Sequence, residues 1–235
     1  MLLQKIPHKS APKTEGVRLS ASDEPFVDIE EFSSGAILTD MKYAEASRPG
    51  AVTTAYARLG VAEKLLCAAR LLPAGMRLKI YDAWRPYSVQ RSLYDEYYSS
   101  LRDKPENAHL SEEELHRIAR RYVSFPAEGK ALSYVHSSGG AIDLTIVGAD
   151  GEELDMGSGF DDFSPASALS ALEGSDTAAE ENRRLLYTVM TSVGFTPYAE
   201  EWWHYDYGDL FWAASVGEDA IYSSIYREDE LDVRH

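Results

Sequence analysis

Two short stretches of the chain carry residues that could do chemistry together. His136 and Asp143 flank a pair of glycines, and Glu201 and His204 flank two tryptophans. Two neutral imidazoles and one carboxylate suit a catalytic zinc ion, which keeps a fourth position for water. The remaining carboxylate can then act as a general base. The sequence therefore predicts His136, Asp143 and His204 as ligands of one zinc ion per chain and Glu201 as the base.

The spacing of these residues requires turns. His136 and Asp143 are seven positions apart and would lie on opposite faces of one flat strand. The Gly-Gly pair between them lets the chain turn, so that His136 ends one segment and Asp143 lies on the next. Glu201 and His204 can face one site if Glu201 lies at a turn or bulge that leads into a strand.

Asp143 has an alternative interpretation. It stands in the apolar stretch Ala-Ile-Asp-Leu-Thr-Ile, where an unpaired charge would cost roughly several kcal/mol. A bound metal would offset that cost, but a salt bridge would also do so. From the residues alone both explanations stay open, and the Glu201–His204 pair is what makes the metal site the better one.

The elements that must position these residues follow from apolar periodicity and from capping and turn signals. Helices are expected over 55–72, 88–101, 111–123 and 177–193, strands over 26–32, 76–80, 132–136, 141–147 and 195–207, and a long loop over 40–53. An Asp-Gly turn at 150–151 predicts that 141–147 pairs with 152–156. Helices gather in the first half and strands in the second, so we expect an α+β fold with a small, mostly antiparallel sheet that carries the zinc site and is flanked by helices.

Length and composition limit the possible functions. The 235 residues predict a loose arm over 1–20 and one domain over 21–235. The net charge of −16 argues against nucleic acid or an anionic membrane as a partner. Cys67 is the single cysteine, which excludes an internal disulfide and a cysteine-based zinc site. The N-terminus lacks the apolar core of a signal peptide and no stretch reaches the length of a membrane span, so we expect a cytoplasmic location.

Several motifs together resemble the VanX-type D-alanyl-D-alanine dipeptidases. They are HSSGGAIDLT at 136–145, EWWHY at 201–205 and DAWRP at 82–86, with further matches at 156–161 and 182–186. The resemblance runs from about 27 to 205. It implies the α+β fold, zinc ligation by His136, Asp143 and His204, and Glu201 as the base. It further implies that Arg85, just beyond a predicted strand, stabilises the transition state.

The resemblance also points to residues beside the substrate. Asp161 matches a family position near the substrate, where a carboxylate could pair with the ammonium group of a dipeptide. Tyr134 and Val135 stand before His136 where small serines are expected, one of which is thought to contact the substrate. Tyr134 is therefore expected at the substrate, where its bulk would oppose an N-acyl group. Asp162 follows where an aromatic residue is usual. These departures bear on substrate specificity and not on the zinc chemistry.

The predicted function is zinc-dependent hydrolysis of the dipeptide D-alanyl-D-alanine to free D-alanine, with a small D,D-dipeptide as the binding partner. One alternative is a zinc D,D- or L,D-carboxypeptidase that acts on peptidoglycan peptides. Another is a non-catalytic zinc-binding module of the same fold, as in hedgehog signalling domains. Retention of Glu201 and Arg85 counts against the module. The missing signal peptide counts against the carboxypeptidase, whose substrates lie outside the membrane. The sequence leaves the oligomeric state open.

Overall fold

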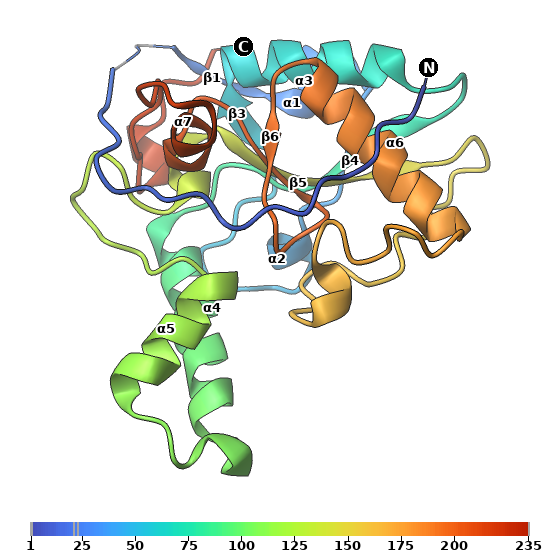
Figure 1. Cartoon of the computed structure of the whole chain (residues 1–235). Helices are drawn as coiled ribbons and strands as arrows, with labels where there is room; N and C mark the ends of the chain where they lie inside the picture. The colour runs from blue at the N-terminus through green and yellow to red at the C-terminus, as the bar shows by residue number, and fades with distance from the viewer. Residues whose placement is uncertain (1, 21, 23, 235) are drawn as a thin grey trace.

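A five-stranded sheet forms the centre of the computed structural model, which describes residues 2–20, 22 and 24–234 (Figure 1). Its strand order is β2 (Leu38–Thr39), β4 (Arg77–Asp82), β5 (Ala141–Val147), β7 (His204–Asp206) and β6 (Thr196–Pro197). β2 runs parallel to β4, and the remaining neighbours in this sheet are antiparallel. β1 (Phe26–Asp28) and β3 (Tyr56–Arg58) form a second, antiparallel pair. The predicted α+β fold with a small, mostly antiparallel sheet is confirmed.

Helices surround this sheet, and two of them project from it. They are α1 (Ile29–Phe32), α2 (Lys42–Glu45), α3 (Leu59–Leu71), α4 (Tyr87–Arg102), α5 (Glu112–Tyr122), α6 (Ala178–Ser192) and α7 (Leu210–Val216), with 3₁₀ turns η1 (Pro105–Asn107), η2 (Val135–Ser138), η3 (Pro165–Ser167) and η4 (Glu228–Glu230). α3 and α6 pack against each other. α4 and α5 form a hairpin that extends away from the rest of the molecule and has its own small apolar cluster (Figure 1).

The helix ends follow the capping signals in the sequence. The Ser111 hydroxyl accepts a hydrogen bond from the Glu114 backbone N–H, and the Glu114 carboxylate accepts one from the Ser111 N–H, so α5 starts with a complete capping box. The Thr177 hydroxyl accepts from the Glu180 N–H at the start of α6. The helices predicted over 88–101, 111–123 and 177–193 are present, with each end shifted by one residue.

β5 is the strand that connects the core to the site. Ile142, Leu144 and Ile146 are fully buried in the main apolar cluster. Because side chains alternate along a strand, Asp143 and Thr145 point to the opposite face. The predicted pairing of 141–147 with 152–156 is limited to the end of β5, where Val147 and Glu153 form an isolated bridge and the Leu154 N–H donates to the Ile146 carbonyl. The pairing stays short because β5 already has β4 on one edge and β7 on the other.

Three predicted boundaries in the first half are wrong for local reasons. The strand expected over 26–32 stops at Asp28, whose carboxylate accepts from the Glu30 and Glu31 N–H groups and starts α1. The helix expected over 55–72 begins at Leu59, because 56–58 pair with β1. The loop expected over 40–53 contains α2.

Two expected strands near the site also differ. Residues 132–136 are not a strand; the chain forms η2 and leaves it through Gly139 at φ 73°. The strand expected over 195–207 is divided into β6 and β7 by the turn that holds Glu201. Both differences replace extended chain with a turn, which is what brings His136 and Glu201 toward β5.

The N-terminal residues lie against the body. Ile6 is buried in the main core, and its N–H donates to the Glu173 carboxylate at 3.0 Å. Leu19 forms an isolated bridge with Ala220. The division into an arm and a domain stays a prediction.

Within the described residues, no helix combines the length and apolar character needed to cross a membrane, and the predicted cytoplasmic location stays untested.

The turn at Gly139 gives a stability prediction. A Cβ there would overlap the Phe26 ring and would also force an alanine into the left-handed region. Gly139→Ala should therefore lower the free energy of unfolding by about 2–5 kcal/mol, from backbone strain and overpacking combined. Gly129→Ala has a similar φ but no atom within 4 Å of the added Cβ, so it should cost only about 1–2 kcal/mol. Equal losses for the two variants in urea denaturation would show that the Phe26 contact is unimportant.

Candidate active site

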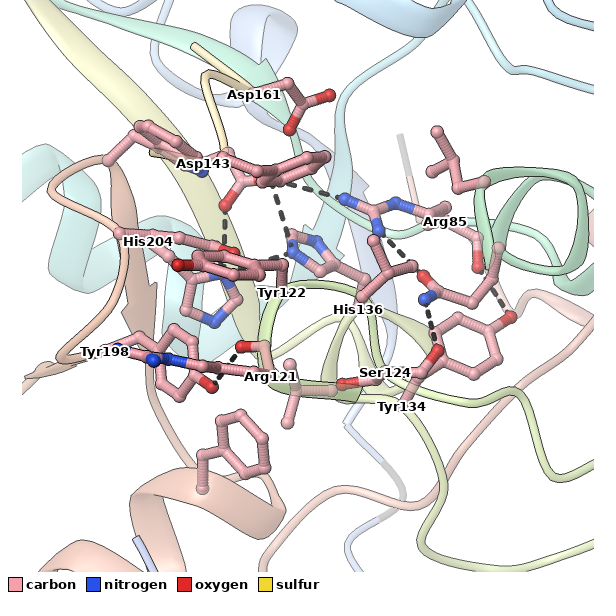
Figure 2. A pocket seen from close by; sticks show the side chains of 18 of the residues that line it. Arg85, Arg121, Tyr122, Ser124, Tyr134, His136, Asp143, Asp161, Tyr198 and His204 are labelled. Carbon is pink, nitrogen blue, oxygen red and sulfur yellow. Dashed lines mark hydrogen bonds and ion pairs between the residues drawn. The ribbon is translucent and has the colours of Figure 1, made fainter. Parts of the chain in front are cut away.

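Three of the predicted site residues converge on one point. Asp143 on β5 and His204 on β7 are direct partners across the antiparallel pair, and His136 reaches them from η2. One ligand atom from each residue lies within 4.8 Å of the others, and all three side chains are buried. Figure 2 shows the three pointing toward one another at the pocket floor. The arrangement matches the predicted set of two imidazoles and one carboxylate.

Hydrogen bonds fix which nitrogen each imidazole offers. His136 Nδ1 lies 2.8 Å from the Ala83 carbonyl and must donate to it, which leaves Nε2 to face Asp143 Oδ2 at 3.3 Å. His204 Nε2 lies 2.8 Å from Asp206 Oδ1, which leaves Nδ1 to face Asp143 Oδ1 at 2.9 Å. The two free nitrogens are 3.3 Å apart. Both can therefore act as neutral ligands of the same cation.

The charges at this point favour a cation. Burial alone would lower the pKa of His204, but Asp206 and Asp143 outweigh it and raise that pKa well above its ordinary value. The carboxylates therefore attract positive charge to the position that His204 Nδ1 faces. A divalent metal can take the place of the proton there. With neutral imidazoles the residues fit a zinc ion in donor type, in number and in charge.

Arg85 lies beside the three ligands and is held in place. Its guanidinium donates to Asp82 at 2.7 Å and to Gln90 at 2.7 Å, and its Nη2 is 3.3 Å from Asp143 Oδ2 (Figure 2). Burial would lower the pKa of Arg85, but Asp82, Tyr43 and Asp143 raise it above its ordinary value. The guanidinium is therefore a permanent positive charge at the cleft, aimed by its acidic neighbours.

Glu201 lies in the turn before β7, as the spacing predicted. Its Oε2 is 3.9 Å from His204 Nδ1, and the side chain is buried. Burial raises the pKa of Glu201 well above its ordinary value, so this carboxyl group accepts a proton readily. Glu200, one position earlier, instead forms a 2.7 Å ion pair with the exposed Arg121. Glu201 is therefore buried in the cleft, whereas Glu200 pairs with an arginine at the surface.

These residues line one cleft of about 540 Å³, a volume that includes solvent at its mouth. Asp161 and Tyr134 also line it, and in Figure 2 Asp161 lies on the far side of Asp143 from Arg121. Asp161 is partly exposed as a residue, but its carboxyl group is enclosed, and this burial raises its pKa to about 7. The Tyr43 hydroxyl donates to Asp161 at 3.0 Å.

Tyr134 is packed against the cleft rather than free in it. Its hydroxyl donates to the Arg85 carbonyl at 2.9 Å, and the side chain is buried. Its ring therefore occupies a fixed part of the cleft wall. The structure brings all seven sequence-predicted site residues to this cleft, and their roles with substrate remain proposals.

Sequence reasoning missed several residues that hold the site. Asp82 and Gln90 hold Arg85, Tyr43 holds Asp161, and Asp206 holds His204. Asp206 could have been found, because it is two positions after His204 and so shares its strand face. Asp82 stands three positions before Arg85 at a strand end, which is a weaker signal. Tyr43 lies in a segment assigned to a loop and offered no signal.

Comparison with known proteins identifies the family. The family model described as D-ala-D-ala dipeptidase matches residues 40–221, which is most of the chain. The chain belongs to this peptidase family.

Relatives named D-alanyl-D-alanine dipeptidase agree with this assignment. The Synechocystis sp. protein is 30% identical over 175 residues, 66% of this chain and 70% of that protein. The Streptomyces coelicolor protein is 33% identical over 189 residues, 77% of this chain and 90% of that one. The Escherichia coli protein is 35% identical over 134 residues, 57% of this chain, and the match spans just over half of that protein (56%). The predicted resemblance and the prediction of a peptidase are confirmed.

The ligand geometry predicts how the protein holds metal. Wild-type protein should bind about one zinc ion per chain, and His136→Ala should reduce this to near zero by removing one ligand. His116→Ala is the matched control, because His116 instead stacks on Tyr98 and contacts the Tyr94 hydroxyl in the α4–α5 hairpin. Elemental analysis after dialysis measures the content. Full zinc in His136→Ala, or zinc lost from His116→Ala, would contradict the assignment.

Proposed function

We propose that the protein is a zinc-dependent dipeptidase that hydrolyses D-alanyl-D-alanine to free D-alanine. The observation that carries the proposal is the convergence of His136, Asp143 and His204 beside a buried carboxyl group and a fixed guanidinium in one cleft. Membership of the dipeptidase family supports the same reaction. When bound, zinc would activate a water molecule and polarise the peptide carbonyl.

Glu201 is the residue that moves the proton. Its raised pKa and its place beside the ligands allow it to accept a proton from the attacking water and to deliver it to the leaving amine. The leaving group is the amine of the C-terminal alanine, so each turnover returns Glu201 to its starting state. A non-catalytic zinc module would not require a buried carboxyl group beside the ligands, and a buried acid of this kind is costly to keep.

Arg85 stabilises the charge that develops on the carbonyl oxygen. Asp82 and Gln90 fix the guanidinium before substrate arrives, so little reorganisation is needed when the oxyanion forms. Its Nη2 already faces the ligand Asp143, which places positive charge at the reacting end of the cleft. An arginine with two anchoring partners keeps this geometry, whereas a lysine would offer a point charge on a flexible stem.

Asp161 and Tyr134 are the residues that we expect to limit the size of the substrate. The enclosed Asp161 carboxylate would pair with the free ammonium group of a dipeptide. The wall formed by Tyr134 is fixed by its bond to the Arg85 carbonyl and cannot easily move aside for an acyl chain. Both features favour a free dipeptide over the longer peptides that the alternative carboxypeptidase would cleave.

The first functional prediction separates the base from its neighbour. Glu201→Ala should keep zinc but lower kcat for D-alanyl-D-alanine by roughly 10²-fold or more, since it removes the proton acceptor and no ligand. Glu200→Ala breaks only the pair with the exposed Arg121 and should leave kcat nearly unchanged. Steady-state kinetics on zinc-loaded protein decides between them. An inactive Glu200→Ala with an active Glu201→Ala would reverse the assignment, and wild-type protein without turnover of this dipeptide would refute the substrate.

A second prediction concerns the substrate ammonium. N-acetyl-D-alanyl-D-alanine should be cleaved with a kcat/KM roughly 5- to 150-fold below that of the free dipeptide, because it leaves the Asp161 carboxylate desolvated and unpaired. Asp161→Asn should remove most of this preference, while Asp162→Asn, at an exposed position, should keep it. Equal kcat/KM for both substrates with wild-type protein would instead favour the carboxypeptidase.

The pKa of Asp161 gives a pH prediction. A value raised to about 7 leaves the group neutral below that pH and ionised above it, and only the ionised form pairs with an ammonium. The loss of kcat/KM caused by Asp161→Asn should therefore be large at about pH 8 and should shrink as the pH falls below 7. A bound cation favours the ionised form and moves the midpoint to lower pH. A loss that is the same at every pH would exclude this role.

A further inference from the structure

Two acidic residues behind His204 are not used in the reaction described above. Asp206 follows His204 by two positions on β7, so both side chains lie on the same face, and Asp206 Oδ1 is 2.8 Å from His204 Nε2. Both side chains are buried. Asp206 therefore contacts the ring nitrogen that faces away from Asp143.

Asp209 follows Asp206 by three positions and caps the next helix. One oxygen of Asp209 accepts from the Phe211 and Trp212 N–H groups at the start of α7, each at 2.9 Å. Its other oxygen is buried and has no N–H or O–H donor among the described residues.

The pair has a fixed place in the fold. The Tyr207 N–H donates to the Gly140 carbonyl at 3.0 Å, and a Cβ at Gly140 would overlap the Tyr207 carbonyl and approach Asp209 Cβ to 3.2 Å. Only a residue without a side chain lets the 207–209 segment come this close to the turn after His136. The carboxyl pair is therefore held between β7, α7 and that turn.

We propose that Asp206 is a positioning residue for His204. Asp206 accepts the Nε2–H of His204, which fixes the imidazole in the tautomer and orientation that present Nδ1 to the metal. This inference rests on the proposed zinc site. Outer carboxylates of this kind typically change metal affinity by roughly 10- to 100-fold when they are removed.

Asp209 offers a matched comparison on the same segment. It is buried like Asp206, but its oxygen caps α7 and no hydrogen bond joins it to His204. Asn at this position offers the same helix-capping oxygen at nearly the same volume.

The test compares zinc dissociation constants measured by competition with a chromophoric chelator. Asp206→Ala should weaken zinc binding roughly 10- to 100-fold, and Asp206→Asn, which keeps the volume, should weaken it by about 10-fold. Asp209→Asn is the matched control and should stay within about 3-fold of wild type, because its amide oxygen can keep the hydrogen bonds that cap α7. If Asp206→Ala fails to fold, Asp206→Asn carries the comparison.

A second readout separates positioning from a merely structural role. In zinc-loaded protein with ¹⁵N-labelled histidine, His204 should show the Nε2–H tautomer with a slowly exchanging proton, and this proton should exchange faster in both Asp206 variants. Variants that only melt at lower temperature, with unchanged zinc affinity and tautomer, would overturn the inference. So would an Asp209→Asn variant as impaired as Asp206→Ala. Tight zinc binding by wild type and by the Asp206 variants alike would refute this inference and leave the proposed function intact.

Discussion

Burial of negative charge at one end of the sheet is the constraint on which the rest of the site depends. Carboxyl groups surround the cleft floor and are buried or enclosed there: Asp82, Asp143, Asp161, Glu201, Asp206 and Asp209. Arg85 neutralises part of this charge through Asp82 and Asp143. Burial, to which neighbouring carboxylates add, raises the pKa of Glu201, Asp161 and Asp209. Asp206 and Asp143 favour positive charge at His204. A divalent ion held by His136, Asp143 and His204, as proposed, would offset part of this charge.

The sheet supplies the rigidity that such a cluster needs. Asp82, Asp143 and His204 are aligned across β4, β5 and β7, so their spacing is set by backbone pairing. The apolar side of β5 is locked into the main core. Turns bring in the residues that strands could not reach: η2 carries His136, and the turn before β7 carries Glu201. A displacement at either turn would separate the base or one ligand from the other groups.

The same physical features explain what the sequence could predict. Donor types and turn signals were sufficient to identify His136, Asp143, His204 and Glu201 as one group, because a charged residue in an apolar strand needs a partner. Helices with caps, such as α5 and α6, were found because their hydrogen bonds are local.

Long-range contacts account for what the sequence did not predict. The pairing of 56–58 with β1, and the occupation of both β5 edges by β4 and β7, depend on residues distant along the chain. The residues that hold the functional side chains in place were harder still to predict from the sequence. Tyr43 and Asp161 meet across more than a hundred residues, and no local pattern marks that contact. Asp206 differs from these partners, because strand alternation alone places it on the same face as His204 and could have identified it.

Anomalous X-ray scattering at the zinc edge, from crystals of the zinc-loaded protein, tests the central claim most directly. One peak per chain is predicted, bonded to His136 Nε2, His204 Nδ1 and an Asp143 carboxylate oxygen. Its open side should face Glu201, and Arg85 should lie across the cleft. A peak bonded to His204 Nε2, a peak outside these three residues, or a site bonded by Glu201 as a fourth protein ligand would contradict the account.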